Sequence, residues 1–358
     1  MSTKVETTNT TASLPWQSLT SFTASTILSE KVWRVVNDLL FVAAGLSLYA
    51  IGSRAIRQAP PALSYASYIV LALTVRKIVS TIIGYAVYPA TLMFSKDQLA
   101  RQEEHATQQL NHQGFITQKI TLYKSGVAYD ATIIGHKDTI ANGKWVIHAF
   151  GNGMAMEQVM DKIPGENLRN GANTLLVNGS SVGRSKGFPT RYQKSAGFEA
   201  GLQFLEKEVK ATHIAFKGLS LGGGMMSEAV LTHKFDLSKV KYLGISDRTF
   251  SRLSDVAAAL VGCIVTPIFY LSGVQLDSVA GAEKLKQLKI EHIIIQHSSK
   301  QHRGTDGVIP DCVSLAPKLE PAQTRTFLLS PKIPHDGYLP RDIDTQLHEK
   351  VKTFFGQA

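Results

Sequence analysis

Residues 212–230, with the sequence THIAFKGLSLGGGMMSEAV, combine an apolar strand, a glycine-rich turn and the start of a helix. The turn contains the pattern G-x-S-x-G, from Gly218 through Ser220 to Gly222. A sharp turn of this kind exposes the serine hydroxyl above the sheet edge, where side chains at both glycine positions would collide with neighbouring backbone. The pattern therefore predicts Ser220 as a nucleophile. A turn that merely packs strand against helix is the alternative.

Other uses of the glycines are poorly supported. A P-loop would end in Gly-Lys-Ser/Thr, but residues 224–226 are GMM. A dinucleotide fingerprint would need a third glycine in residues 151–156, which are GNGMAM. His297 and His302 lack a nearby Glu or Cys that would complete a metal site. We expect no cofactor and no metal.

Short β-rich runs alternate with longer helical runs through most of the chain, which is typical of a mostly parallel sheet covered by helices. Strands are predicted at 117–123, 128–135, 145–150, 173–177, 213–217, 240–245, 292–296 and 325–329. Helices are predicted at 154–162, 192–209, 223–233, 279–288 and 345–355.

The composition points to an apolar surface or membrane partner. Only 18% of the 358 residues are charged, against about 25% in typical soluble domains. The net charge of +10 suits anionic lipid, while no basic run longer than two residues supports nucleic-acid binding. Two cysteines cannot build a disulfide framework.

The N-terminal third divides by composition. Residues 1–30 form a Ser/Thr-rich polar tail without the features of a cleaved signal peptide, and 31–96 form an apolar helical region expected to associate with a membrane. Its apolar blocks, 39–53, 61–75 and 78–95, are each shorter than the roughly 20 residues of an upright span. A membrane hairpin or re-entrant anchor with transmembrane helices is favoured, and interfacial helices or buried helices are the alternatives. Residues 97–113 are predicted as a linker helix.

The last domain, 114–358, contains a second feature of acyl-transfer sites. Residues 148–153, HAFGNG, close a strand and precede a predicted helix. This position supplies an oxyanion-hole donor in hydrolases with a serine elbow, so the backbone N–H groups of Asn152 and Leu221 are the candidates. An ordinary tight connection would also explain Gly151 and Gly153.

In this order the motifs resemble those of the α/β-hydrolase family. The resemblance spans about 115–356 and is strongest to membrane-tethered lipases that act on monoacylglycerol and lysophosphatidylserine-like lipids. It extends to a poorly characterised hydrolase group of intracellular bacteria such as Chlamydia and Legionella. Phe150 precedes Gly151 where the family commonly has histidine. The motifs are FGNG at 150–153, NGSSVGRSKG at 178–187, GLSLGG at 218–223, SDRTF at 246–250, TDGVIP at 305–310 and PHD at 334–336.

The resemblance implies a serine ester hydrolase with the chain order serine, acid, histidine, which works through an acyl-enzyme. Asp306 follows the strand predicted at 292–296 and is the preferred acid, with Asp247 and Asp311 as alternatives. Asp306 would also suit a helix N-cap. His335, in the loop after the last strand, is the expected base.

The substrate class follows from the predicted cap at 251–280. Its segment 256–274, VAAALVGCIVTPIFYLSGV, has no charge and would line an acyl pocket or touch lipid, although it could also pack on the core. We expect a lipid or another long-chain ester as substrate. A thioester or peptide hydrolase, and a catalytically silent binding module such as a bacterial protein delivered into a host cell, are the alternatives. The sequence leaves the oligomeric state open.

Overall fold

A computed structural model describes residues 14–25, 61–88, 90–299 and 303–356. The strands are β1 (Ser21–Thr23), β2 (Phe115–Lys124), β3 (Val127–His136), β4 (Lys144–Ala149), β5 (Asn173–Val177), β6 (His213–Leu219), β7 (Lys241–Asp247), β8 (Glu291–His297) and β9 (Arg325–Ser330). They form one nine-stranded sheet in the order β1-β2-β3-β5-β4-β6-β7-β8-β9. β5, β4 and β6 to β9 run parallel, and β3 is antiparallel to both neighbours. All eight predicted strands are confirmed, with ends within two residues of the prediction.

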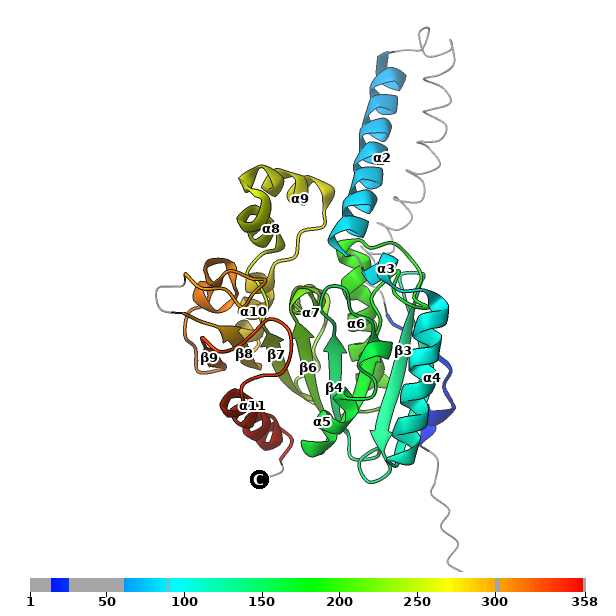
Figure 1. The fold of residues 1–358 in the computed structure, drawn as a ribbon. Helices are drawn as coiled ribbons and strands as arrows, with labels where there is room; N and C mark the ends of the chain where they lie inside the picture. The colour runs from blue at the N-terminus through cyan, green and yellow to red at the C-terminus, as the bar shows by residue number, and fades with distance from the viewer. Residues whose placement is uncertain (1–13, 26–60, 89, 300–302, 357–358) are drawn as a thin grey trace, which may run out of the picture.

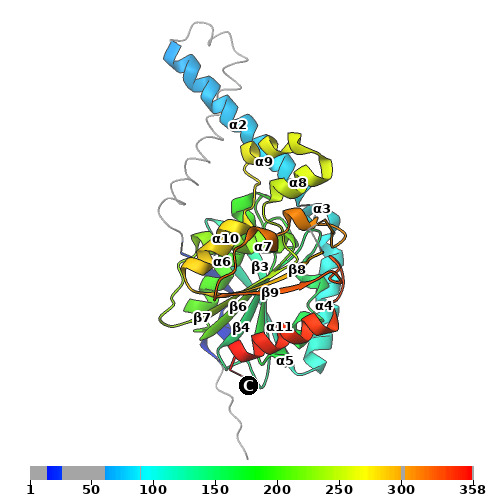
Figure 2. The same ribbon diagram turned by 90° about the vertical axis from the view of Figure 1, so that its left-hand side faces the viewer.

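Helices cover both faces of the sheet (Figure 1, Figure 2). α6 (Arg191–Lys207), α7 (Leu221–Thr232) and α10 (Ser278–Gln287) cover one face, and α4 (Lys96–His112), α5 (Ile163–Arg169) and α11 (Arg341–Phe354) cover the other. α2 (Pro61–Val87), α3 (Ala90–Met93), α8 (Leu253–Val261) and α9 (Thr266–Ser272) lie beyond the carboxyl ends of the parallel strands. The 3-10 helices are η1 (Pro15–Ser18), η3 (Met156–Gln158), η4 (Cys263–Val265), η6 (Asp311–Val313) and η7 (Ala316–Lys318).

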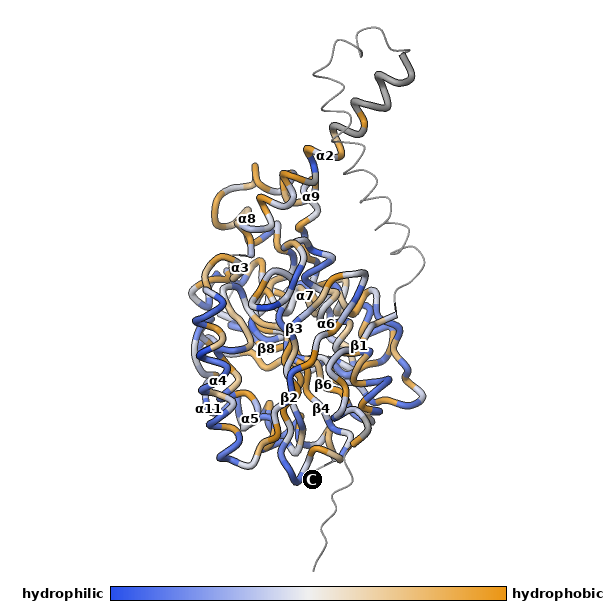
Figure 3. The backbone as a smooth tube through the Cα atoms, turned by 90° about the vertical axis from the view of Figure 1, so that its right-hand side faces the viewer, coloured by the Kyte–Doolittle hydropathy of each residue, from blue (hydrophilic) through white to orange (hydrophobic). Residues whose placement is uncertain are grey.

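α8 and α9 occupy the position predicted for the cap, between β7 and β8. They stand beside the lower part of α2, and Figure 3 shows apolar residues over both helices. Arg76 Nε of α2 donates a hydrogen bond to the Leu271 carbonyl of α9 at 2.8 Å. The cap and α2 are therefore in direct contact above the sheet edge.

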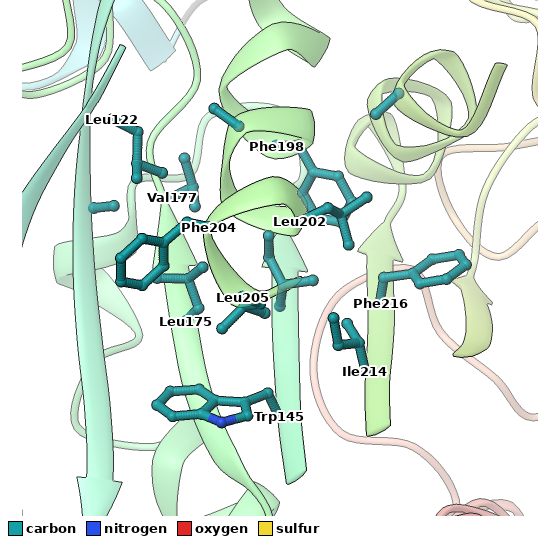
Figure 4. Packing of buried hydrophobic residues seen from close by; sticks show 14 of the residues in the cluster. Leu122, Trp145, Leu175, Val177, Phe198, Leu202, Phe204, Leu205, Ile214 and Phe216 are labelled. Carbon is teal, nitrogen blue, oxygen red and sulfur yellow. The ribbon is translucent and has the colours of Figure 1, made fainter. Parts of the chain in front are cut away.

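Alternate residues of the central strands pack against different helix layers. Leu175 of β5 and Ile147 of β4 belong to the cluster that contains Phe204 of α6, and Figure 4 shows Leu175 beside Phe204. The next residue on β5, Leu176, and the preceding one on β4, Val146, belong to clusters on the opposite face. Because both faces are covered, these strands are apolar almost throughout, which is why their positions were predictable.

Part of the segment predicted as a polar tail belongs to the core. Within 14–25, β1 pairs parallel with β2 at the sheet edge. Trp16 packs edge-on against Trp145 with ring centroids 5.7 Å apart, and Phe22 packs in the same way against Phe204 at 5.6 Å. Two aromatic side chains thus anchor a stretch whose overall composition is polar.

The predicted linker helix is present as α4, and it packs against the sheet. Leu99, Ala106 and Leu110 are buried on one side of the helix. Lys119 of β2 also forms an ion pair with Glu103 of α4 at 2.8 Å. α4 is therefore one of the layers that cover the sheet.

One predicted helix, at 154–162, is wrong. The chain forms the short η3 there, and α5 begins at residue 163 with a proline in its first turn. The Asn178 side chain accepts a hydrogen bond from Met156 N at 2.9 Å, and Gln158 Oε1 accepts one from Ala155 N at 2.9 Å. These side chains satisfy backbone donors locally and favour a tight turn over a longer helix.

The transmembrane prediction is not supported. Among the described helices, none has both the length and the apolarity that crossing a bilayer requires. α2 contains the predicted apolar block 61–75 and part of the block 78–95. The other predicted block, 39–53, lies outside the described residues. The end of α2 docks on the main domain, where a Cβ at Gly84 would collide with the Pro189 carbonyl.

Candidate active site

Ser220 occupies a strained turn between β6 and α7. Its φ of 52° and ψ of −118° lie where residues other than glycine are disfavoured. The Ser220 N–H donates to the Asp247 carbonyl at 2.8 Å, and the Ser220 carbonyl accepts hydrogen bonds from Thr249 Oγ1 at 2.6 Å and from Gly223 N at 2.9 Å. The surrounding backbone therefore holds the strained conformation from both sides.

The two glycines of the elbow are sterically required. A Cβ at Gly218 would lie 2.6 Å from the Gly223 Cα atom, and a Cβ at Gly222 would collide with the Ala149 backbone. Real Cβ atoms do not approach backbone so closely, so α7 can start directly against β4 and β6 only with glycine at both positions.

Asp306 and His335 are brought together by the loops that follow β8 and β9. His335 Nδ1 lies 2.8 Å from Asp306 Oδ2, and the His335 N–H donates to the Asp306 carbonyl at 2.7 Å. The other carboxylate oxygen, Oδ1, accepts hydrogen bonds from Val308 N at 2.9 Å and Ile309 N at 2.7 Å. The imidazole is thus held through one nitrogen by a carboxylate that is itself fixed.

The Asp306 side chain is fully buried, with 0% of its surface exposed. Burial raises the pKa of this carboxyl, but hydrogen bonds from His335 and from the Ile309 and Val308 N–H groups outweigh burial and hold the pKa below its ordinary value. Asp306 is therefore ionised at neutral pH and can stabilise a positive charge on His335.

Arg248 ties the His335 loop to the segment that holds Ser220. Its Nη1 atom donates to the carbonyls of Pro334 at 3.1 Å and Gly337 at 3.0 Å. Its Nε atom donates to Asp247 Oδ1 at 2.8 Å. Asp247 in turn accepts from the Ser220 N–H through its carbonyl. The motif SDRTF at 246–250 marks this region in the sequence, but only the fold shows that its arginine holds the His335 loop through hydrogen bonds.

Ser220, Asp306 and His335 lie at one edge of the sheet, since all three follow the carboxyl ends of parallel strands. Within the described part of the chain, no hydrogen bond joins Ser220 Oγ to the His335 ring, whose Nδ1 atom contacts Asp306. Catalytic hydrogen bonds are often long in unliganded enzymes and shorten when substrate binds. Asp306 and His335 are thus paired at the sheet edge that also carries Ser220.

The two alternative acids have other partners. Asp247 is buried and pairs with Arg248 and with Lys217, whose Nζ lies 3.2 Å from Oδ2. Asp311 accepts from the Ser299 hydroxyl at 2.6 Å and lies 2.6 Å from His297 Nδ1. Neither carboxylate contacts His335, so Asp306 is the acid that the geometry favours.

The candidate oxyanion donors lie close to the serine. Leu221 is the first residue of α7, so its N–H has no acceptor within the helix. A Cβ at Gly151 would lie 3.6 Å from the Ser220 Cβ atom, which brings the turn containing Asn152 beside the elbow. Asn152 and Leu221 line the same pocket. The arrangement suits two N–H groups that converge on a developing oxyanion.

The space inside this pocket, including the part that is open to solvent, is about 500 Å³. Its walls are mainly apolar and include Phe150, Phe198 and Met225. Tyr88, which follows α2, and Lys194 of α6 also line it. Sequence reasoning missed both, because neither belongs to a motif and only the fold brings them to the elbow.

Metal-ligating side chains are not grouped in the described part of the chain, where no three His, Cys, Asp or Glu residues gather as a metal site would require. His297 pairs with Asp311, and His302 lies outside the described residues.

The solved structures that align with this chain include an α/β-hydrolase, an esterase and a lipase. An α/β-hydrolase from Vibrio vulnificus aligns with a TM-score of 0.52 and 15% identity, covering 76% of this chain and 92% of that chain. A Pyrococcus furiosus esterase aligns at 0.48 with 14% identity, covering 70% and 93%. A soluble variant of Saccharomyces cerevisiae monoglyceride lipase aligns at 0.43 with 12% identity, covering 68% and 95%. At 15% identity the likeness to the Vibrio vulnificus structure shows the fold alone, and it confirms the predicted α/β-hydrolase fold.

A search of curated proteins gives no match. The family model described as "Chlamydia CHLPS protein (DUF818)" matches residues 67–352, which include the elbow, the turn at 150–153 and the Asp306–His335 pair. That range covers most of the chain and agrees with the predicted resemblance to a hydrolase-like group of Chlamydia. The chain is therefore a member of the Chlamydia CHLPS protein family, built on an α/β-hydrolase fold.

Proposed function

We propose that the protein is a serine ester hydrolase in which Ser220, His335 and Asp306 form the catalytic triad. The observation that carries the proposal is the buried Asp306–His335 contact of 2.8 Å at the sheet edge that also presents the strained Ser220. A carboxylate fixed by two backbone N–H groups and bonded to Nδ1 leaves Nε2 of the imidazole free to accept a proton.

The reaction begins with attack of Ser220 Oγ on the ester carbonyl, while His335 Nε2 removes the hydroxyl proton. The N–H groups of Asn152 and Leu221 stabilise the tetrahedral oxyanion, each by about 3 kcal/mol. Collapse of this intermediate breaks the ester C–O bond, and the protonated His335 donates its proton to the leaving alcohol. A water molecule, activated by the same imidazole, then hydrolyses the acyl-enzyme and restores Ser220.

We also propose that the enzyme works at a lipid surface and takes a lipid or another long-chain ester. The cap exposes large apolar side chains: Leu260 at 62%, Val261 at 69%, Ile264 at 79% and Leu271 at 70%. The adjoining α2 exposes apolar residues too, namely Ile69, Val75, Ile78, Val79 and Ile82. Contiguous exposed apolar surface of this kind is typical of membrane or partner contacts, and the net charge of +10 favours anionic lipid.

The catalytic proposal is tested with a fluorophosphonate probe, which phosphorylates activated serines. We expect labelling of the full chain and of Ser238→Ala, which removes an exposed serine, and no labelling of Ser220→Ala. Absence of a Ser220-dependent adduct in the wild-type protein would contradict the proposal and favour a binding module without catalytic activity.

Substrate class is tested with p-nitrophenyl esters of increasing chain length. We expect kcat/KM to rise from acetyl to longer acyl groups, and a preference for acetyl would count against a lipid substrate.

Lipid contact is tested by sedimentation with vesicles of phosphatidylcholine and phosphatidylserine. Binding should decrease when Leu260→Glu and Ile264→Glu are combined, and it should persist in Leu237→Glu, which changes an exposed leucine far from the cap. Equal binding by all three proteins would exclude the cap as the lipid-binding surface.

A further inference from the structure

Lys194 is a buried cation without a counter-charge. Only 4% of its surface is exposed, and no carboxylate of the described residues forms an ion pair with it. Its Nζ atom lies 5.3 Å from the centroid of the Tyr88 ring, and its aliphatic stem passes close to Gly179. A cation–π contact offsets only part of the cost of removing an ammonium group from water.

Two buried carboxylates, Glu228 and Glu157, pair with groups other than Lys194. Glu228 pairs with Arg191 at 2.6 Å, and Glu157 accepts two hydrogen bonds from the Asn178 side chain at 3.0 Å. Burial alone lowers the pKa of Lys194 to about 7, so a substantial fraction of this side chain is charged at neutral pH. The fold thus maintains an ammonium group that lacks an anionic partner.

The position of this cation relates it to the reaction. Lys194 lines the pocket that Asn152 and Leu221 also line, so a ligand in the pocket adjoins the candidate oxyanion donors. Phe150, Phe198 and Met225 make much of the remaining wall apolar, and no described residue that lines the pocket carries a negative charge. Tyr88 directs its hydroxyl to the Val274 carbonyl at 3.2 Å.

We infer that this pocket is an anion-binding subsite, in which Lys194 binds a carboxylate or phosphate of an otherwise apolar ester substrate. The inference rests on the proposed esterase function and deepens it by naming a chemical feature of the substrate. An anionic oxygen satisfies the ammonium donors and restores the missing counter-charge, whereas a purely apolar chain leaves the cation buried and unpaired. The apolar walls suit the hydrocarbon part of the substrate to which the anion is attached.

Binding is measured by calorimetric titration of the full chain with monobutyl phosphate, hexanoate and the uncharged 1-hexanol. We expect wild-type protein to bind at least one of the two anions at least tenfold more tightly than 1-hexanol. Tighter binding of monobutyl phosphate identifies a phosphate ester as the natural group, and tighter binding of hexanoate identifies a carboxylate.

The variant Lys194→Met keeps the stem and removes the charge, and it should bind the anions at least tenfold more weakly. Lys194→Arg should retain anion binding, and Lys350→Met, which changes an exposed lysine of α11, should match the wild type. Equal anion affinity in the wild-type and Lys194→Met proteins, or no anion binding by the wild type, would overturn the inference.

A kinetic comparison separates this inference from the proposed function. p-Nitrophenyl hemiglutarate, with a terminal carboxylate, is compared with the uncharged p-nitrophenyl valerate. Lys194→Met should lower the hemiglutarate-to-valerate ratio of kcat/KM at least tenfold, and an unchanged ratio overturns the inference. Loss of Ser220 labelling in the wild type, with Lys194-dependent anion binding intact, would refute the esterase and leave the subsite in place.

Discussion

Two acid–histidine pairs lie near the same edge of the sheet, and they differ in how the chain holds each histidine. His335 Nδ1 lies 2.8 Å from Asp306, and His297 Nδ1 lies 2.6 Å from Asp311. His297 is the last residue of β8 and pairs in register with Ser330 of the neighbouring strand. His335 lies in the loop beyond β9, outside the sheet ladder.

The hydrogen-bond donors to the two carboxylates differ as well. Asp311 accepts hydrogen bonds from the N–H and hydroxyl of Ser299 and from the Gly304 N–H, which close the loop after β8. Besides His335, the Asp306 side chain accepts hydrogen bonds from the N–H groups of Val308 and Ile309, and Arg248, next to the elbow, holds the His335 loop. The two acid–histidine contacts are thus alike in length but differ in surroundings, and we expect the pair whose loop connects to the elbow to serve the proposed reaction.

The largest expected difference between the two acid–histidine pairs is in kcat after each histidine is replaced by alanine. His335→Ala should lower kcat for p-nitrophenyl butyrate by about 10³-fold or more, because the general base is lost. His297→Ala should change kcat less than about tenfold. Steady-state kinetics on both folded variants measures the difference, and similar losses in the two variants would refute the division of roles.

Replacing the acids should divide activity from stability. Asp306→Asn should lower kcat by about 10³-fold, since the amide cannot stabilise the imidazolium or fix its tautomer. Asp311→Asn should leave kcat nearly unchanged but lower the free energy of unfolding by about 2 kcal/mol, because charge-assisted hydrogen bonds to His297, Ser299 and Gly304 are weakened. Urea unfolding and ester hydrolysis measure the two effects, and a large kcat loss in Asp311→Asn would reverse the assignment.

Arg248 is a positioning residue, and its loss should have an intermediate effect. Arg248→Met removes the hydrogen bonds to the Pro334 and Gly337 carbonyls, so kcat should decrease about 10- to 100-fold with little change in KM. Arg248→Lys should restore part of the loss. Arg252→Met, which removes an exposed ion pair with Asp277, is the control and should match the wild type. A change in KM alone would argue against a role in placing the imidazole.

The smallest expected effect is the change with pH in the stability that Asp311 contributes. Burial raises the pKa of Asp311, but hydrogen bonds from Ser299 and His297 outweigh it and hold the pKa below its ordinary value. This stabilisation is fully present above the unfolded-state pKa of about 4 and is lost as pH falls through the lower folded-state value. The stability difference between wild type and Asp311→Asn should therefore shrink below pH 4, and a constant difference from pH 6 to pH 2 would contradict it.

Local patterns predicted the parts of the protein whose interactions are local. The elbow was predictable because Gly218, Ser220 and Gly222 are close in sequence and their steric demands act over one turn. The buried strands were predictable because parallel strands covered on both faces are continuous apolar runs. Asp306 and His335 were predicted from motif order by resemblance, and their contact across 29 residues of sequence needed the fold.

Other features depend on contacts between distant segments. The role of residues 14–25 as an edge strand rests on aromatic contacts with Trp145 and Phe204. The clamp of Arg248 on the His335 loop and the buried position of Lys194 have no sequence signature, since arginines and lysines are usually exposed.

By itself, then, the sequence determined the strand pattern, the nucleophile elbow and the order of candidate triad residues, because steric and periodic constraints act within a few residues of each other. Only the tertiary structure decided which acid meets His335, what holds its loop and which cation lines a pocket with Asn152. Those choices depend on burial and on charges from segments far apart in the chain, whose desolvation and pairing energies exist only once the chain has folded.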